Sequence, residues 1–215
     1  MYTVIGLIAI FVISFLLGSI PWGIVIGKLF FHVDIRKSGS GNIGTTNAMR
    51  VIGKKGGAAV FLLDFGKGLL SGWLATLIGS LCLVDASAWP SMNEFLALSF
   101  IGCVAGHIYS PWLAFHGGKG IAVAVGALFF VFGPVGALLE LSIFIVLVII
   151  TRRVSVGSIA SAVACPFFSL YYFWGDPFAW VLATLAAAFV TYAHRANIER
   201  LIAGTEPKFS AKKDH

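Results

Sequence analysis

Charged side chains are scarce in this chain, and their scarcity limits the kind of protein it can be. Of its 215 residues, 59% are hydrophobic and only 11% are charged, whereas a soluble domain carries about 25% charged residues. A chain this apolar would expose large hydrophobic patches to water, so the expected solvent is a lipid bilayer. The net charge of +6 lies in segments between apolar runs, which indicates orientation in a membrane and not nucleic-acid binding.

Motifs of metal-dependent and nucleophilic enzymes are missing as well. The three cysteines, Cys82, Cys103 and Cys165, lie inside apolar runs without the spacing of a zinc or redox site. The sequence has no G-x-S-x-G elbow, no H-E-x-x-H pair and no carboxylate cluster for magnesium, so we expect neither a metal nor a cofactor. The H-x-x-x-x-D motif of many acyl-CoA acyltransferases is also missing, because His194 and Glu199 would lie about 140° apart on a regular helix.

Long apolar runs are what the chain does contain, and they predict an all-α membrane protein with seven transmembrane helices. A spanning helix needs about 20 apolar residues. The first run has no basic residue before it and no small-residue cleavage pattern after it, so we interpret it as a retained helix and not as a signal peptide. The predicted spans are Thr3–Leu29, Ala58–Val84, Glu94–Leu113, Gly120–Phe132, Val135–Ile150, Ser158–Trp174 and Pro177–Ala193.

The distribution of charge decides how the two shortest spans are connected. If Gly133 and Pro134 form a tight turn between them, 14 of the 15 lysine and arginine residues fall on one side of the membrane. The positive-inside rule assigns that side to the cytoplasm, and the opposite loops carry Asp85 and Asp176 and no basic residue. We therefore expect one membrane domain over 1–215, with its N-terminus outside, its C-terminus cytoplasmic and a frayed tail at 210–215.

The first polar stretch on the cytoplasmic side has the composition of a phosphate-binding loop. Glycines let successive backbone N–H groups face one anion, small hydroxyls add donors, and an arginine one helical turn later adds charge. A flexible linker is the alternative, although a linker needs neither the asparagines nor the arginine. The glycines also match a dinucleotide fingerprint, which we reject because its acidic partner, Asp64, lies inside an apolar run. The candidate residues are Ser38, Gly39, Ser40, Gly41, Asn42, Gly44, Thr46, Asn47 and Arg50.

Two further candidate groups come from the middle of the chain. Asp64 and Lys67 are three residues apart and share a helix face. Charges inside a span are costly and suggest function, but an ion pair that only joins helices is an equally good interpretation. A second glycine-rich segment repeats the logic of an anion site without matching a Walker A loop, and its histidine has an interfacial structural role as the alternative. This segment contributes His107, Ser110, Gly117, Gly118, Lys119 and Gly120.

The last candidates lie on the cytoplasmic side of the final two spans. Ser158 is predicted to open a helix, where it would cap the helix or bind an anion. His194 and Asn197 are three residues apart on one helix face, Arg200 continues that face, and Glu206 follows a glycine break. An amphipathic interfacial tail is the alternative, but histidine, asparagine and glutamate are poor membrane anchors.

These motifs together resemble the bacterial acyl-phosphate:glycerol-3-phosphate acyltransferase family. The likeness covers Gly18 to Lys208, and the Asp64 and Lys67 pair and the seven-span layout fit it too. Thr45 stands where the family usually has alanine, and Ala114 and His116 stand where basic residues are common, which weakens the charge near Lys119. The motifs that carry it are Ser38–Asn47 with Arg50, Ser110-Pro followed by Gly117–Gly120, and His194 to Lys208.

The resemblance implies an enzyme of the bacterial inner membrane that begins phosphatidic acid and phospholipid synthesis. A fatty acyl phosphate would acylate the 1-hydroxyl of glycerol 3-phosphate, giving 1-acyl-glycerol 3-phosphate (lysophosphatidic acid) and inorganic phosphate. Loop residues 38–47 would bind the acyl phosphate, and the glycerol 3-phosphate side would comprise Arg50, Lys119, Ser158, His194 and Asn197. Ser38, Arg50, Lys119, His194 and Asn197 would be catalytic, with either His194 or a donor phosphate oxygen as the base. Supporting roles fall to Asp64, Lys67, His107, Ser110, Gly117, Gly118, Gly120, Arg200 and Glu206.

The expected partners are acyl phosphate, glycerol 3-phosphate and membrane lipid, with neither nucleic acid nor metal, and we expect a monomer. Whether a cytoplasmic enzyme that produces acyl phosphate docks on this face stays open. A transporter is the main rival interpretation, but transporters usually show an internal repeat and broken helices near the midplane. The second rival is an acyltransferase that uses acyl-CoA or acyl carrier protein as donor.

Overall fold

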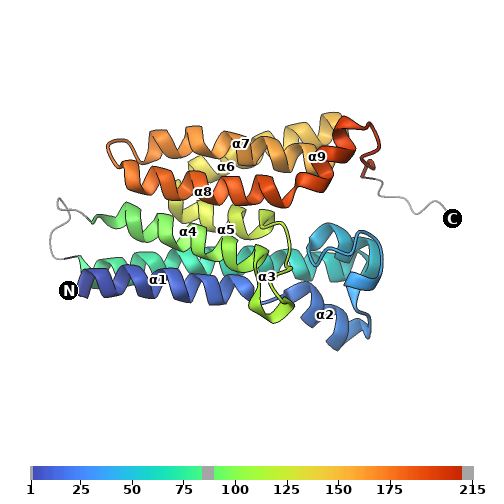
Figure 1. Ribbon diagram of the computed structural model, residues 1–215, viewed down its shortest axis with the longest axis horizontal. Helices are drawn as coiled ribbons and strands as arrows, with labels where there is room; N and C mark the ends of the chain where they lie inside the picture. Colours follow the sequence, from blue (N-terminus) through green and yellow to red (C-terminus); the bar gives the residue numbers. More distant parts are fainter. Residues whose placement is uncertain (1, 84–89, 210–215) are drawn as a thin grey trace.

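A computed structural model describes residues 2–83 and 90–209, and every regular element in them is helical (Figure 1). The end of the second predicted span at Val84, the loop at Asp85 and the predicted tail at 210–215 lie outside the described residues. The α-helices are α1 (Tyr2–Ser19), α2 (Trp22–Phe31), α3 (Thr45–Cys82), α4 (Met92–Ile108), α5 (Ile121–Val131), α6 (Gly133–Thr151), α7 (Val154–Tyr172), α8 (Pro177–Ala193) and α9 (Arg195–Ile202).

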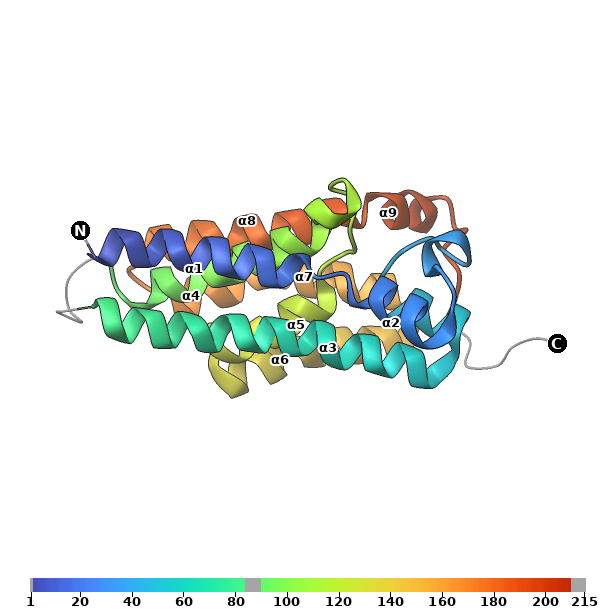
Figure 2. The same ribbon diagram turned by 90° about the horizontal axis from the view of Figure 1, so that it is seen from below.

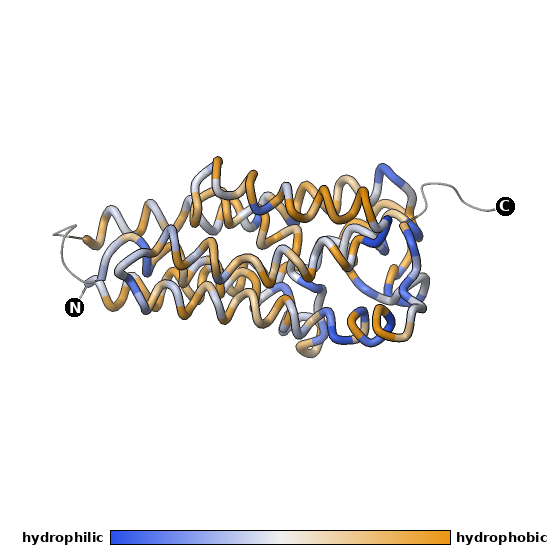
Figure 3. The backbone as a smooth tube through the Cα atoms, turned by 90° about the horizontal axis from the view of Figure 1, so that it is seen from above, coloured by the Kyte–Doolittle hydropathy of each residue, from blue (hydrophilic) through white to orange (hydrophobic). Residues whose placement is uncertain are grey.

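The long helices run side by side along the long axis of the molecule (Figures 1 and 2). Helix α4 packs against both α1 and α8, and α5 packs against α3 and α4, so α4 and α5 lie at the centre of the bundle. The short helices α2 and α9 lie at the same end, where hydrophilic residues gather, as Figure 3 shows. The bundle therefore has one polar end that is built from segments distant in sequence.

The surface and the interior have the pattern of a protein that lies in lipid. Large apolar side chains face outward, among them Phe167 at 71% and Trp174 at 82% exposure, while α6 buries only Gly136, Ala137 and Glu140. Small residues make the helix crossings, as is typical of membrane bundles. A Cβ atom on Gly126 of α5 would collide with the backbone carbonyl of Phe65 in α3, so a larger residue would push these two helices apart.

The predicted number of spans is matched only in part. Within residues 2–83 and 90–209, five helical segments are long and apolar enough to cross a membrane, and a sixth is added if α8 and α9, which meet at 56°, form one broken span. Helix α5 has 11 residues and is only about 16 Å long. The all-helical membrane fold is therefore confirmed, and the count of seven crossings and the orientation stay predictions.

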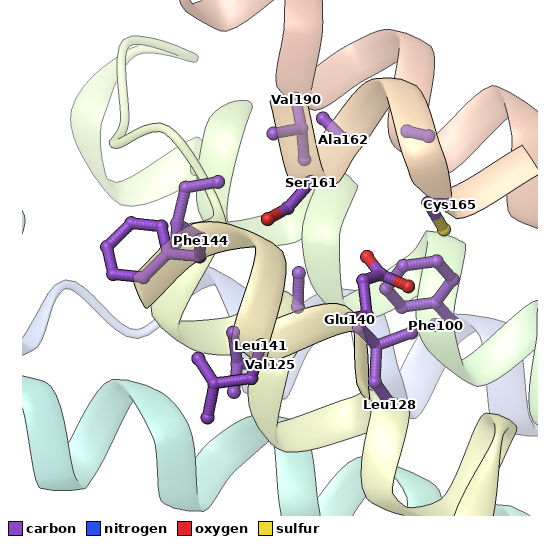
Figure 4. Close-up of a pocket in the computed structure, with 13 residues that line it drawn as sticks. Phe100, Val125, Leu128, Glu140, Leu141, Phe144, Ser161, Ala162, Cys165 and Val190 are labelled. Carbon is purple, nitrogen blue, oxygen red and sulfur yellow. The ribbon is translucent and has the colours of Figure 1, made fainter. Parts of the chain in front are cut away.

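The turn between the two shortest predicted spans is present. Gly133 has a φ of 66°, which is unusual for other residues, and Pro134 begins the next helix. Helices α5 and α6 pack against each other after this turn, and Leu128 of α5 and Glu140 of α6 line a common pocket (Figure 4).

One predicted span is divided and two predicted helix starts are wrong. The first span, found as Tyr2–Phe31, is divided into α1 and α2 between Ser19 and Trp22, because Pro21 has no N–H to donate and restricts the residue before it. The second helix begins at Thr45, thirteen residues before the predicted start at Ala58, and bends at Gly53, whose φ and ψ of 79° and 177° are not helical. Helix α7 begins at Val154 and not at Ser158, so Ser158 does not open a helix.

Candidate active site

The first glycine-rich loop is held together by one buried side chain, Asn47. Its Oδ1 accepts a hydrogen bond from the Ser40 N–H at 2.8 Å, and its Nδ2 donates to the carbonyls of Ile35, Ser38 and Asn42 at 2.8, 3.2 and 2.9 Å. Asn47 is only 2% exposed, so the loop wraps around its amide. These contacts explain why an asparagine follows the glycines: it fixes the shape of the loop from within.

The remaining loop residues surround this centre. Gly39 adopts a φ of 64°, and a Cβ atom there would collide with Asn47 Oδ1, so this tight turn requires glycine. Asn42 Oδ1 accepts from the Gly44 N–H at 2.9 Å, which closes the turn before α3. Among the described residues, no side chain caps the start of α3 at Gly44, and Thr46 lies in its first turn. A helix start of this kind favours an anion.

The outer rim of the same loop faces solvent. Ser38, Gly39, Ser40 and Gly41 are exposed, and Arg50 is exposed one turn into α3. The Ser38 and Ser40 hydroxyls and the Arg50 guanidinium are therefore placed where a ligand from the aqueous side can reach them.

The second loop is fixed to the bundle by its two ends. At its start, Ser110 Oγ donates to the Ser19 carbonyl at 2.7 Å and Trp112 Nε1 donates to Ser19 Oγ at 2.8 Å. Further on, the N–H groups of Gly117 and Gly118 donate to the carbonyls of Ile108 and His107 at 2.9 and 3.0 Å. The loop thus folds back over the end of α4 and presents Lys119 just before α5 begins after Gly120.

Asp64, Lys67 and His107 form a buried network inside the bundle. Lys67 Nζ lies 2.9 Å from Asp64 Oδ1, 2.9 Å from His107 Nδ1 and 2.9 Å from the Ile20 carbonyl. The Lys67 ammonium thus forms an ion pair with Asp64 and hydrogen bonds with His107 and the Ile20 carbonyl, and both charged side chains are almost fully buried. The spacing of Asp64 and Lys67 correctly predicted a shared helix face, and these contacts favour the interpretation as a lock between α3, α4 and the α1–α2 break.

This lock also touches the second loop. Gly118 packs directly against the His107 ring, because a Cβ atom at Gly118 would collide with His107 Nε2. The buried network therefore supports the backbone that carries Lys119, although it does not itself open to the surface.

Lys119 belongs to a second polar network, at the polar end. Its Nζ donates to Asn197 Oδ1 at 2.5 Å, and Asn197 Nδ2 donates to Glu206 Oε1 at 2.7 Å. Arg200 Nε donates to Glu206 Oε2 at 2.7 Å. The structure therefore brings together four of the candidate residues from two predicted motifs, and Glu206 fixes the segment after α9 beneath them.

The surroundings of Lys119 disfavour the protonated form of its amine. Burial is the main cause that lowers its pKa from 10.5 to about 8, and the positive charges of Arg200 and Arg50 act in the same direction. The carboxylate of Glu206 acts in the opposite direction and offsets part of this effect. Lys119 and Arg200 thus lie on either side of the Asn197–Glu206 contact, and positive charge gathered in this way is suited to an anion.

Glu206 keeps its own charge in this setting. Burial acts to raise its pKa, but hydrogen bonds from Ser155, Asn197 and Arg200 outweigh burial and lower the pKa below its ordinary value. Glu206 therefore remains an acceptor for all three groups at neutral pH.

His194 lies at the bend between α8 and α9. Its Nδ1 contacts the Val190 carbonyl at 2.8 Å, and because a carbonyl only accepts, Nδ1 carries the proton. Burial lowers the pKa of His194 to about 4 despite this hydrogen bond. The ring is thus neutral at pH 7, with the lone pair on Nε2, which is the form that a general base requires.

Two serines of α7 differ from what the sequence suggested. Ser158 is 2% exposed and donates to the Val154 carbonyl of its own helix at 3.0 Å, so its hydroxyl is not directed at the Lys119 network. Ser155, which sequence reasoning did not select, donates to Glu206 Oε1 at 2.6 Å. A serine in the first turn of an apolar helix carries no pattern that would have identified it.

An apolar pocket begins next to these polar groups, between α4, α5, α6, α7 and α8 (Figure 4). Ile121 and Val190 line it, and they lie close in sequence to Lys119 and His194. In the part of the chain that the structure describes, no three His, Cys, Asp or Glu side chains gather as metal ligands would. The site therefore offers cations, amides and a neutral histidine beside a hydrophobic space.

Known proteins are similar to this chain in sequence and in architecture. A family model described as glycerol-3-phosphate acyltransferase matches residues 8–204. The chain is 40% identical over 210 residues to the glycerol-3-phosphate acyltransferase of Gloeobacter violaceus, with 97% of each chain covered. It is 39% identical over 209 residues to that of Thermosynechococcus vestitus, with 97% of this chain and 96% of the relative covered.

A solved structure is similar over the same length. The crystal structure of PlsY (YgiH), an integral membrane glycerol 3-phosphate acyltransferase in its glycerol 3-phosphate form, matches with a TM-score of 0.81 and 36% identity. The match covers 95% of this chain and 96% of that chain. Family model, relatives and structure agree over nearly the whole sequence, and the chain therefore belongs to the glycerol-3-phosphate acyltransferase family of integral membrane acyltransferases.

Proposed function

We propose that this protein transfers a fatty acyl group from an acyl phosphate to the 1-hydroxyl of glycerol 3-phosphate. The products are 1-acyl-glycerol 3-phosphate and inorganic phosphate, which would be the first step of phosphatidic acid synthesis at a bacterial inner membrane. The observation that carries the proposal is the position of Lys119, held by Asn197 beside the Arg200–Glu206 pair and two residues before Ile121, which lines an apolar pocket. A phosphate-bearing, water-soluble acceptor and a lipid donor need these two environments side by side.

The glycerol 3-phosphate side is assigned to Lys119 and Arg50. Lys119 donates only to the neutral amide oxygen of Asn197 among the described residues, so its charge is left for a phosphate. A bound dianion would stabilise the protonated amine, offsetting the burial that lowers its pKa. Asn197 and Glu206 position the ammonium, and Arg200 holds Glu206. Ser158 is the weakest member of this group, because its hydroxyl bonds to its own helix.

The donor phosphate is assigned to the first loop. Ser38 and Ser40 on the exposed rim and the uncapped start of α3 supply donors. In this assignment Asn47 acts by shaping the loop, because both ends of its amide are already bonded to loop backbone.

The chemistry needs no protein nucleophile, because an acyl phosphate is already activated. The 1-hydroxyl oxygen attacks the acyl carbonyl carbon, the bond from that carbon to the phosphate oxygen breaks, and phosphate leaves with the bonding electrons. The hydroxyl proton passes either to His194 Nε2 or to a phosphate oxygen of the donor. The protein's contribution is to hold the two substrates together and to stabilise the developing negative charge.

The test is turnover by the purified protein in detergent or lipid mesophase. Labelled glycerol 3-phosphate is supplied with palmitoyl phosphate in one reaction and palmitoyl-CoA in another. Lysophosphatidic acid formed from the acyl phosphate alone is the expected result. Product from the thioester alone would keep the acyltransferase and overturn the proposed donor, and Lys119→Met, measured alongside, gives the background rate.

A further inference from the structure

The apolar pocket runs from the polar site into the bundle. Its outer end is marked by Ile121, two residues after Lys119, and by Val190, whose carbonyl accepts the His194 proton. Its inner end is formed by Phe100, Leu128, Glu140 and Cys165 (Figure 4). Ile121 and Leu128 are seven residues apart on α5, which corresponds to about 10 Å along the helix.

The inner end of the pocket is closed and the outer end is more open. Phe100, Leu128 and Cys165 are 2%, 4% and 2% exposed. At the outer end, Ile121 and Phe144 are partly exposed. A ligand would therefore enter from the side of Lys119 or between the helices there, and would end against the inner group.

Glu140 is the unexpected member of that inner group. It is 4% exposed, and in the described structure its Oε2 has no hydrogen-bond partner. Figure 4 shows its carboxyl directed into the pocket toward Phe100 and Cys165. An unpartnered carboxyl inside a membrane helix is costly and is retained for a reason.

We propose that Glu140 is a specificity-determining residue that limits the length of the acyl chain that the pocket accepts. The inference rests on the proposed acyl transfer and adds a residue to its donor side. A chain that stops short of Glu140 buries its methylenes against apolar walls. A chain that reaches Glu140 would have to place its methylenes against a buried carboxyl oxygen that already lacks a hydrogen-bond partner among the described residues, and it could not supply one.

The test compares kcat/KM for saturated acyl phosphates from decanoyl to stearoyl in the full-length protein. Glu140→Leu keeps the approximate volume and removes the polar atoms. The expected result is a rise of at least about 10-fold in the ratio of long-chain to short-chain kcat/KM, the range in which hydrophobic pockets discriminate by methylenes. Glu140→Gln keeps a polar end and is expected to retain the wild-type ratio. The KM for glycerol 3-phosphate should not change in either variant.

Leu139→Ala is the matched control, because Leu139 adjoins Glu140 on α6 but is 53% exposed and does not line the pocket. An unchanged chain-length ratio in Glu140→Leu, or an equal change in Leu139→Ala, would overturn the inference while leaving the proposed function intact. If Glu140→Leu does not fold, Glu140→Ala takes its place with the same expected direction. If the wild-type protein uses no acyl phosphate of any length, the proposed donor is wrong and the inference falls with it.

Discussion

Lys67 is buried and Lys119 is partly buried. The two lysines differ in whether their ammonium groups remain available to bind a ligand. Lys67 is 3% exposed and directs its ammonium at a carboxylate, an imidazole nitrogen and a carbonyl. Lys119 is partly exposed and, in the described part of the chain, donates to one neutral amide oxygen. A buried cation that is paired with a carboxylate inside the bundle joins helices, whereas a cation that contacts a neutral amide oxygen is available for an anion.

The difference teaches how a membrane enzyme separates stability from binding. The Lys67 network is compensated within the bundle and supports the second loop through His107 and Gly118. The Lys119 network lies at the polar end, where a substrate phosphate would complete the compensation. Substitutions in the first should therefore change stability, and substitutions in the second should change turnover.

The largest expected effect comes from breaking the buried pair. Lys67→Met removes the lysine that pairs with the buried Asp64 carboxylate, and breaking a buried ion pair costs about 3–5 kcal/mol. We expect a large drop in the apparent Tm in detergent. The double variant Asp64→Leu with Lys67→Met removes both charges and should recover much of the loss. A single variant as stable as the wild type would contradict the interpretation of Lys67 as a lock.

Replacing Lys119 should reduce activity and leave stability almost unchanged. Lys119→Met is expected to lower kcat/KM for glycerol 3-phosphate by about 100- to 1,000-fold, the usual effect of losing one preorganised charge contact. The apparent Tm should change little, because Lys119 is not a lock and its burial already disfavours the charge. Lys119→Arg keeps the charge and should retain part of the activity. Normal turnover in Lys119→Met would remove Lys119 from the site.

The pH dependence of kcat/KM should also separate the role of Lys119 in activity from its role in stability. With its pKa lowered to about 8, Lys119 loses its proton as the pH rises through 8, so kcat/KM, which reports the free enzyme, should fall toward a slope of ~10-fold per pH unit. Because the folded pKa lies below the ordinary value, the stability contribution of Lys119 rises, and does not fall, between about 8 and 10.5. The loss of activity is therefore not unfolding, and Lys119→Arg should abolish this limb.

The features that could be predicted from the sequence are those that depend on residues close together in the chain. The three-residue separation of Asp64 and Lys67 identified their shared helix face, and Gly133-Pro134 identified the turn between α5 and α6. Pro21 was also visible in the sequence, but the apolar run continued across it, so the division into α1 and α2 was not predicted. The start of α7 was predicted at Ser158, where the apolar run begins. The helix itself begins at Val154, so Val154 and Ser155 belong to its first turn.

Contacts between distant segments were not predictable from residue patterns. The sequence did not indicate that the Lys67 ammonium would meet His107 and the Ile20 carbonyl, or that Asn197 would meet Lys119 78 residues away. Only the resemblance to a family placed Lys119 and Asn197 in one site. Nor did any pattern identify Ser155, since a single serine in an apolar helix most often bonds to its own backbone.

Ser155 and Ser71 offer the smallest and finest comparison, because each hydroxyl belongs to one of the two regions. Ser155 Oγ donates to Glu206 Oε1 at 2.6 Å, and Ser71 Oγ donates to Ser14 Oγ at 2.8 Å within the bundle. Each substitution by alanine removes a hydrogen bond whose net contribution is about 1 kcal/mol. In Ser155→Ala the loss loosens the support of Asn197 and Lys119, so we expect kcat/KM for glycerol 3-phosphate to fall about fivefold.

Ser71→Ala should instead lower the apparent Tm by a few degrees and leave kcat/KM for glycerol 3-phosphate unchanged, because Ser71 contacts Ser14 in the bundle interior. Measuring both quantities on both variants therefore tests whether the bundle interior and the Lys119 network are separate. If Ser71→Ala lowered kcat/KM as much as Ser155→Ala does, the bundle interior would be coupled to the site.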